Sequence, residues 1–346
     1  MKIALVLGSG GARGFAHIGV IEELERRGHE VVTVAGTSMG AVIGGIYSSG
    51  NLPEFAEWAT SLTQFDVLRL YDPALRSPGV IKADRVMDEF VEISGDVRIE
   101  DLPIPFTAVA TDITNRREIW FQSGPLRTAL RASTAIPTFI SPIQLHDRLL
   151  ADGGLVNPVP VEPTLSVPSD MTIAVSLTGR PNVTAAPGLR ADAGRSRSSG
   201  RDAEKVTEGE EEPKRYTDDV AGWEPNDDSE RAAEGRRTIT GRLTKAVTDI
   251  FSADSRPFWH RDRDPIEEDP EQPGKLPPGL STMAVLNMSL DTMQSMIERY
   301  RAAANPVSLT IQVPALVCGT LDFHRATEVI EVGRQIAIRE FDEIGL

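Results

Sequence analysis

The first half of the chain alternates short aliphatic runs with amphipathic segments. Residues 2–7 are almost all aliphatic, as in a buried parallel strand. A helix is predicted next, because apolar residues recur on one face at Phe15, Ile18, Ile21 and Leu24. A β-branched run at 31–35 then leads into small and apolar residues at 41–47, which predicts a second strand and helix. Repeated strand–helix units predict an α/β protein with three layers and a mainly parallel central sheet.

The same patterns continue to about residue 180 and resume near residue 283. The further elements expected are strand 105–112, strand 119–121, helix 125–132, strand 173–177, helix 285–303, strand 307–313 and helix 323–341. In the last helix the residues predicted to face inward are Val329, Val332, Ile336 and Phe341. In helix 285–303 the apolar positions form one face, and they are Leu286, Leu290, Met293, Ile297 and Tyr300. We interpret the methionines of this region as packing residues rather than as a lipid-binding patch.

Large apolar side chains also occur in the helical segments and loops between residues 51 and 104. They are Trp58, Phe65, Leu68 and Leu70. They can belong to the core or line an acyl pocket. The core is favoured because large apolar side chains are buried by default.

Composition divides the chain into three parts: a core at 1–180, a charged insertion at 181–282, and a C-terminal strand and helices at 283–346 that complete the core or pack on it. Residues 191–280 carry 22 Asp and Glu against 15 Lys and Arg and are rich in Ser, Gly and Pro. Such a segment buries too little apolar surface to fold, so we expect it to be disordered or loosely helical. An amphipathic helix is predicted within it at 239–251.

Charge and hydropathy narrow the classes of function. The formal net charge of −15 argues against nucleic-acid partners and against electrostatic docking on anionic lipid. The chain has no apolar run of about 18 residues, so no transmembrane segment is expected. The single cysteine excludes an intramolecular disulfide. No His, Cys or Asp cluster has metal-ligand spacing, so no metal or cofactor is expected. We expect a cytoplasmic protein.

The strongest chemical signal is Gly36-Thr37-Ser38-Met39-Gly40, between the strand at 31–35 and the helix at 41–47. In that context Gly-x-Ser-x-Gly forms a nucleophile elbow, a sharp turn that exposes the serine Oγ. The glycines are required because a Cβ there would clash with neighbouring backbone. Taken alone, the pattern also fits a small-residue turn that packs a helix on a strand.

A glycine-rich loop, Gly8 to Gly14, follows the first strand. A dinucleotide fingerprint requires a third glycine where Arg13 stands, and a P-loop requires a Gly-Lys-[Ser/Thr] ending that is absent. The loop instead offers consecutive backbone N–H groups at the start of a helix, which is an anion-binding nest. Beside an elbow serine, the anion that suits it is the oxyanion of acyl transfer.

A third candidate is Asp152-Gly153-Gly154, at the end of a predicted strand. An aspartate followed by two glycines can face a cleft that no side chain crowds. Asp-Gly is also a common β-turn dipeptide, and taken alone this segment reads as a turn.

In combination, the three segments resemble the patatin-like phospholipase family. Gly10 to Gly14 is similar to the family's oxyanion motif, Gly36 to Gly40 to its nucleophile motif, and Asp152 to Gly154 to its acidic motif. Ala132 to Pro137 resembles the segment that precedes the third motif. The resemblance is strong over 1–180, the patatin-like catalytic core, and looser over 283–346. Ser9 departs from it, since many relatives carry glycine there.

The resemblance implies the patatin-like α/β/α fold and a Ser–Asp dyad. Ser38 would attack an ester carbonyl and Asp152 would take its proton, while the backbone N–H groups of Gly10 and Gly11, with Arg13 nearby, would hold the oxyanion. The supporting glycines would be Gly8, Gly14, Gly36, Gly40, Gly153 and Gly154. The implied substrate is a lipid ester, with transient contact at a membrane surface and no cofactor.

Two alternatives remain open beside a dyad hydrolase. A histidine could complete a triad, and His260 and His324 follow Asp152 as α/β-hydrolase order requires. The dyad is favoured because the serine comes too early in the chain for that fold. The second alternative is a regulatory or scaffolding protein that binds a partner through the charged 181–282 insertion.

Overall fold

The structure, a computed structural model, describes residues 1–70, 81–137, 139–179, 280 and 282–346. All of them fall within one compact unit. The insertion predicted at 181–282 and the amphipathic helix predicted at 239–251 lie, apart from the ends of the insertion at 280 and 282, outside the described residues.

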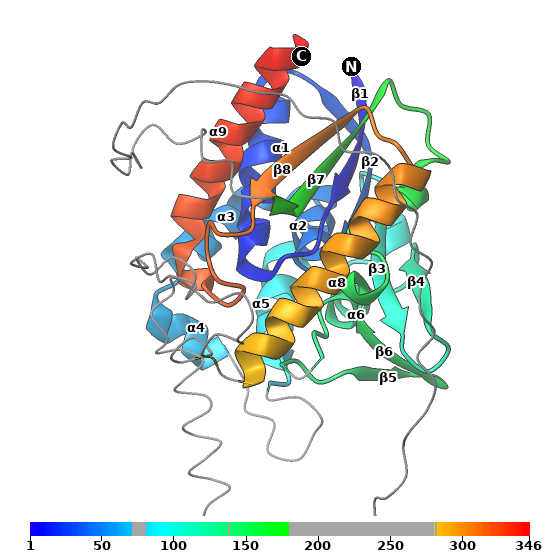
Figure 1. The fold of residues 1–346 in the computed structure, drawn as a ribbon, viewed down its shortest axis with the longest axis vertical. Helices are drawn as coiled ribbons and strands as arrows, with labels where there is room; N and C mark the ends of the chain where they lie inside the picture. Colours follow the sequence, from blue (N-terminus) through cyan, green and yellow to red (C-terminus); the bar gives the residue numbers. More distant parts are fainter. Residues whose placement is uncertain (71–80, 138, 180–279, 281) are drawn as a thin grey trace, which may run out of the picture. The chain divides into compact units, whose positions relative to one another are not determined.

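A mixed sheet forms the centre of this unit (Figure 1). Its order is β5-β6-β3-β2-β1-β7-β8, with β4 paired to β3. The pairs β3-β2, β2-β1, β1-β7 and β7-β8 are parallel, and the edge pairs that involve β4, β5 and β6 are antiparallel. The strands are β1 Lys2–Leu7, β2 Glu30–Thr37, β3 Phe106–Asp112, β4 Arg117–Phe121, β5 Ile143–Leu145, β6 Arg148–Asp152, β7 Met171–Gly179 and β8 Leu309–Pro314.

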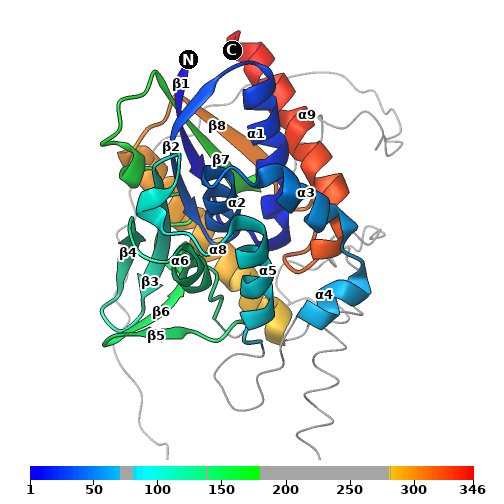
Figure 2. The ribbon, with the colours of Figure 1, turned by 180° about the vertical axis from the view of Figure 1, so that it is seen from behind.

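Helices cover both faces of the sheet. In Figure 1, α8 crosses in front of the strands, and in Figure 2, from behind, α1, α2, α5 and α6 stand in front of them. The α-helices are α1 Ala16–Arg26, α2 Met39–Ser48, α3 Leu52–Ser61, α4 Gln64–Leu70, α5 Asp84–Ser94, α6 Leu126–Ser133, α8 Thr282–Ala304 and α9 Ala326–Ile344. The three-layer α/β/α fold predicted from the sequence is therefore confirmed.

The core continues across the long gap in sequence between its two ends. α1 and α9 cross closely because two glycines face the neighbouring backbone: a Cβ on Gly19 would lie 2.1 Å from the Ile330 carbonyl oxygen, and one on Gly333 would lie 2.1 Å from that of Ala16. α9 buries Val329, Ile336 and Phe341, as its pattern predicts. The C-terminal strand and helix are thus part of the same packed core as β1 and α1.

The register around β3 decides where the functional residues meet. β4 pairs with β3 along one side, so β2 and β6 must share the other. β2 pairs with β3 up to Thr37 opposite Val109, and β6 begins pairing at Asp152 opposite Ala110. The parallel strand ends where the antiparallel strand starts. This end-to-end arrangement brings residue 38 beside residue 152.

Two burial predictions are wrong. Phe65 and Leu68 on α4 are 64% and 39% exposed, because this short helix packs through Val67 instead. On α8 the predicted apolar face is divided: Leu286, Met293 and Tyr300 are exposed, as are Met288 and Met296, whereas Leu290 and Ile297 are partly buried. Met288, Met293 and Met296 therefore do not pack in the core, because mainly polar residues occupy the side of α8 that meets the body.

Candidate active site

Ser38 stands at a strained turn between β2 and α2. Its backbone has φ 57° and ψ −125°, a conformation that non-glycine residues rarely adopt and that is typical of a nucleophile elbow. The flanking glycines are sterically required. A Cβ on Gly36 would lie 2.3 Å from the Gly40 carbonyl oxygen, and one on Gly40 would lie 2.1 Å from that of Leu7.

The Ser38 hydroxyl donates a hydrogen bond to Asp152, with 2.5 Å between Oγ and Oδ2. Both residues are 2% exposed. The other carboxylate oxygen, Oδ1, accepts the Gly154 N–H at 2.7 Å, which fixes the carboxylate plane. Burial raises the pKa of Asp152 from 3.8 to about 6, against the opposing effect of these two hydrogen bonds. A carboxylate of raised pKa in contact with a serine hydroxyl is suited to accept its proton.

Ser133, at the end of α6, holds the elbow in place. Its hydroxyl accepts the Ser38 backbone N–H at 2.8 Å and donates to the Val109 carbonyl oxygen at 2.6 Å. Ser133 is fully buried, so no water can replace it at low cost. It ties the strained residue to the point of β3 where β2 ends. The Ser38 N–H is consequently occupied and is unavailable to an oxyanion.

The glycine-rich loop offers two unoccupied amides. The N–H groups of Gly8, Ser9 and Ala12 donate to backbone carbonyls at 2.8–2.9 Å. Gly10 and Gly11 lie between Ser9 and Ala12, and among the described residues their amide N–H groups have no hydrogen-bond acceptor. Both residues line the same pocket as Ser38 and Asp152. Two free N–H groups beside a nucleophile are what an oxyanion hole requires.

Arg13 is buried behind this loop. Its Nε donates to the Gly10 carbonyl oxygen at 3.0 Å, and its Nη2 lies 3.4 Å from Asp291 Oδ1 on α8. Because a trans peptide directs its C=O and N–H to opposite sides, fixing the Gly10 carbonyl turns the Gly11 N–H the other way. Arg13 thus fixes the orientation of the peptide between Gly10 and Gly11.

The remaining motif glycines keep neighbouring segments close. A Cβ on Gly8 would contact the Val175 carbonyl, one on Gly14 the Met39 side chain, one on Gly153 the Val109 carbonyl, and one on Gly154 the side chains of Gln294, Ser9 and Asp152. Each approach would be shorter than 3.0 Å, apart from the 3.0 Å contact between Gly154 and Asp152. At Gly8, Gly36, Gly40 and Gly153 the close atoms belong to the backbone, so a larger residue there would push neighbouring segments apart, whereas at Gly14 and Gly154 it would displace side chains.

The pocket over Ser38 is lined mostly by polar residues and glycines, and α8 contributes to its wall. Its lining includes Ser9, Gly10, Gly11, Arg13, Ser38 and Asp152 from the N-terminal part, and Asn287, Leu290, Asp291 and Gln294 from α8. No described histidine lines it. His17 makes no hydrogen bond to Ser38 or Asp152. Its Nε2 lies 2.9 Å from the Gly8 carbonyl oxygen, and burial lowers the pKa of its imidazole to about 4. His260 lies outside the described residues.

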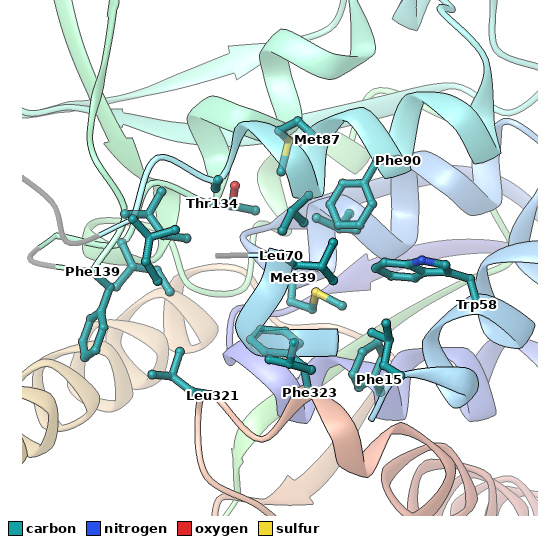
Figure 3. A pocket seen from close by; sticks show the side chains of 18 of the residues that line it. Phe15, Met39, Trp58, Leu70, Met87, Phe90, Thr134, Phe139, Leu321 and Phe323 are labelled. Carbon is teal, nitrogen blue, oxygen red and sulfur yellow. The ribbon is translucent and has the colours of Figure 1, made fainter. Parts of the chain in front are cut away.

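An apolar cavity adjoins this pocket (Figure 3). Ile136 and Phe139 line both. Apart from Thr134, the side chains around the cavity are apolar, and they include Phe15, Met39, Trp58, Leu70, Phe90 and Phe323. Its empty volume is about 800 Å³, including the part that is open to solvent. Trp58 and Leu70, candidates for core or pocket, line this cavity.

Other site types find no support in the described part of the chain. No group of three His, Cys, Asp or Glu side chains there is arranged to hold a metal ion. None of its helices combines the length and hydropathy needed to cross a bilayer.

Sequence reasoning missed Ser133 and the contribution of α8. No local pattern reveals that a serine at a helix end will accept the N–H of the nucleophile. For α8 a signal does exist: the polar residues Asn287, Asp291, Gln294, Glu298 and Arg301 recur at intervals of four and three. This polar stripe, together with Leu290, is the face that meets the body.

The chain is similar in sequence to several known proteins. The family model of patatin-like phospholipase matches residues 5–165. An uncharacterized NTE family protein of Mycobacterium tuberculosis is 41% identical, over 99% of this chain and 91% of the relative. The human patatin-like phospholipase domain-containing protein 6 is 35% identical over 51% of this chain and 13% of its own length. The lysophospholipase NTE1 of Mycosarcoma maydis is 34% identical over 51% of this chain and 10% of its own length.

Proposed function

The chain belongs to the patatin-like phospholipase family and is a lipid-ester hydrolase, and we propose how it acts. It cleaves fatty-acyl esters of phospholipids or lysophospholipids through a Ser38–Asp152 dyad. The observation that carries the proposal is the 2.5 Å hydrogen bond from Ser38 Oγ to Asp152 Oδ2 in a buried pocket. No third residue is needed to activate the serine, because the base contacts the nucleophile directly.

The reaction proceeds in two steps, acylation of Ser38 and hydrolysis of the acyl-enzyme. Ser38 Oγ attacks the ester carbonyl as its proton passes to Asp152 Oδ2, and the N–H groups of Gly10 and Gly11 bind the resulting oxyanion. The intermediate collapses to an acyl-enzyme, and Asp152 returns the proton to the leaving alcohol. Water then attacks the acyl-enzyme as Asp152 takes its proton, and Asp152 passes that proton to Ser38 Oγ when the bond to the acyl group breaks, which releases the fatty acid and restores Ser38.

The apolar cavity supports a fatty-acyl substrate. It begins at the residue after the nucleophile, since Met39 lines the cavity while Ser38 lines the polar pocket. An acyl chain attached to Ser38 would have an apolar space beside it, and burial of each methylene contributes about 0.8 kcal/mol. The alcohol part of the ester would occupy the polar pocket under α8.

A fluorophosphonate probe and a lysophospholipid substrate test this proposal. The probe should label folded wild-type protein at Ser38, and Ser38→Ala should abolish both labelling and release of fatty acid. Ser48→Ala is the matched control: Ser48 is also fully buried, on the helix that Ser38 begins, but lies outside the pocket. The proposal fails if Ser38→Ala keeps substantial activity while its circular dichroism matches that of wild type.

The alternative of partner binding through the charged 181–282 insertion falls almost wholly outside the described residues. The location of the protein in the cell also remains a prediction from composition.

A further inference from the structure

α8 reverses the usual orientation of an amphipathic helix on a protein surface. A helix normally turns its apolar side to the core and its polar side to water. Here the inward side carries Asn287, Asp291, Gln294, Glu298 and Arg301, with Leu290 as an apolar residue among them. The outward side carries Val285, Leu286, Met288, Met293, Met296 and Tyr300, which are 37% to 71% exposed. We call these six residues the α8 stripe.

Polar contacts hold α8 in this orientation. Arg301 donates to the Val156 carbonyl oxygen at 2.9 Å and to Glu162 at 2.5 Å. Glu298 accepts the Thr178 hydroxyl at 2.6 Å. Nearer the N-terminal end, Asp291 lies 3.4 Å from the Arg13 guanidinium. Because these residues bind the body from the inward side, the α8 stripe is held toward solvent.

The chemistry of the α8 stripe selects its partner. Asp291, which faces Arg13, is the single charged residue between 282 and 297, and the exposed Arg299 is the one charged residue beside the stripe, next to Tyr300, so the stripe offers little charge to an ionic partner. Methionine adapts to irregular or fluid apolar surfaces, and tyrosine is favoured at the boundary between headgroups and acyl chains. The net charge of −15 disfavours anionic surfaces. These properties fit the boundary region of a zwitterionic lipid surface.

The position of the α8 stripe relates it to the proposed reaction. The inward side of the same helix lines the pocket that holds Ser38 and Asp152. Figure 1 shows α8 running obliquely across the face of the sheet, with nothing else labelled in front of it. A surface bound to the outward side of α8 would therefore lie one helix diameter, about 10–12 Å, from the pocket. A lipid ester would have to travel only that far from its layer to reach Ser38.

We propose that the α8 stripe is the surface through which this protein docks on a zwitterionic phospholipid layer, an inference that rests on the proposed function for its choice of lipid. A second copy of the chain fits less well. Stable protein–protein interfaces bury about 20–30 residues on each side, whereas this patch is a single helix face of six side chains. One helix face of that width is sufficient for interfacial lipid binding.

Vesicle binding tests the docking surface without requiring turnover. The full chain carrying Ser38→Ala is mixed with phosphatidylcholine vesicles, and the bound fraction is measured by cosedimentation. Addition of Met293→Glu and Met296→Glu should lower the partition coefficient at least about tenfold. Ile344→Glu is the matched control, because Ile344 on α9 is 47% exposed, similar to Met293 at 53%, and should change the partition coefficient less than twofold.

Each outcome decides. The docking surface is wrong if the Ser38→Ala chain fails to bind phosphatidylcholine, if the double variant binds as well as its parent, or if the parent is a dimer that the double variant separates. A Met293→Gln, Met296→Gln pair, which adds no charge, repeats the test if the glutamates disturb folding by circular dichroism. Hydrolysis of phospholipid is measured separately with the wild-type chain. If the wild type does not hydrolyse the lipid while the Ser38→Ala chain still binds the vesicles, the proposed dyad is wrong and the docking surface stands.

Discussion

The polar pocket around Ser38 and the apolar cavity beside it share Ile136 and Phe139 but are built by different parts of the fold. The pocket is made where strands end: β2 leads to Ser38, β6 ends at Asp152, and the loop after β1 supplies Gly10 and Gly11. The cavity is made mostly by helices, with side chains from α2, α3, α4 and α5.

This difference predicts a division of work. Residues at the strand ends are fixed by the sheet's hydrogen-bond register, so they suit chemistry that depends on distance. Helix side chains meet by packing, and packing tolerates exchange of one apolar residue for another of similar volume. Changes in the pocket should therefore affect all ester substrates alike, and changes in the cavity should affect substrates according to chain length.

The largest effect is expected from Asp152→Asn. The asparagine keeps the size of the side chain but cannot take the Ser38 proton, so kcat/KM should fall at least about 10³-fold for every chain length. The measurement is hydrolysis of p-nitrophenyl esters of four to sixteen carbons. A loss confined to long chains would break the division between pocket and cavity.

The same variant should be more stable than wild type at pH 8. The folded pKa of Asp152, about 6, lies above the ordinary 3.8, so the stability it contributes is complete below pH 3.8 and is lost as the pH rises through 6. Removing the buried charge should raise the free energy of unfolding by roughly 1–3 kcal/mol. Asp112→Asn is the control of opposite sign, because hydrogen bonds from Asn115 lower the pKa of Asp112. Equal destabilisation by both changes would contradict the raised pKa.

The next effect concerns pH. Since Asp152 must be ionised to act as a base, kcat/KM should fall about tenfold for each pH unit below its pKa of about 6. Short and long esters should give the same profile, because the titrating group lies in the pocket. A profile that stays flat down to pH 4.5 in protein that remains folded would argue against Asp152 as the base.

Ser133→Ala should have a smaller effect, about 10- to 100-fold on kcat with little change in KM. Without the hydroxyl, the Ser38 N–H loses its acceptor and the strained elbow loses a support. Ser94→Ala is the matched control, since Ser94 also ends a helix and its hydroxyl donates to the Phe90 carbonyl oxygen at 2.7 Å. If the two variants lose the same activity in proportion to their stability, Ser133 has only a structural role.

The smallest expected effect lies in the cavity. Leu70→Trp should fill part of it and lower the ratio of activity on sixteen-carbon to four-carbon esters about tenfold. Leu68→Trp is the control on the same helix, because Leu68 does not line the cavity. If Leu70→Trp lowers activity on sixteen-carbon and four-carbon esters equally, the cavity does not select substrates by acyl-chain length.

What the sequence could predict was local. The spacing of glycines predicts the turns at Gly36 to Gly40 and at Asp152 to Gly154. The alternation of strand and helix patterns predicts the α/β/α fold. The contact between Ser38 and Asp152 depends on how β2 and β6 share one side of β3, and strand register is not written in either motif.

α8 and α9 show the other limit. Both are amphipathic, yet α9 buries its apolar face and α8 exposes most of its own. Periodicity shows that a helix has two faces but not which face meets the body. For α8, hydrogen bonds from Arg301 hold the polar face against the body, and their acceptors, Val156 and Glu162, lie more than a hundred residues away in sequence.

The meeting of β2 and β6 on β3 has a consequence for how this protein can change over evolution. Ser38 and Asp152 are 114 residues apart in the chain, yet the strands that carry them meet at one peptide bond, Val109–Ala110. Insertions or deletions in the intervening loops leave that bond untouched, so loop length can vary without loss of the catalytic pair. A single-residue insertion within β3 would displace the two strand ends by about 3.3 Å and separate them.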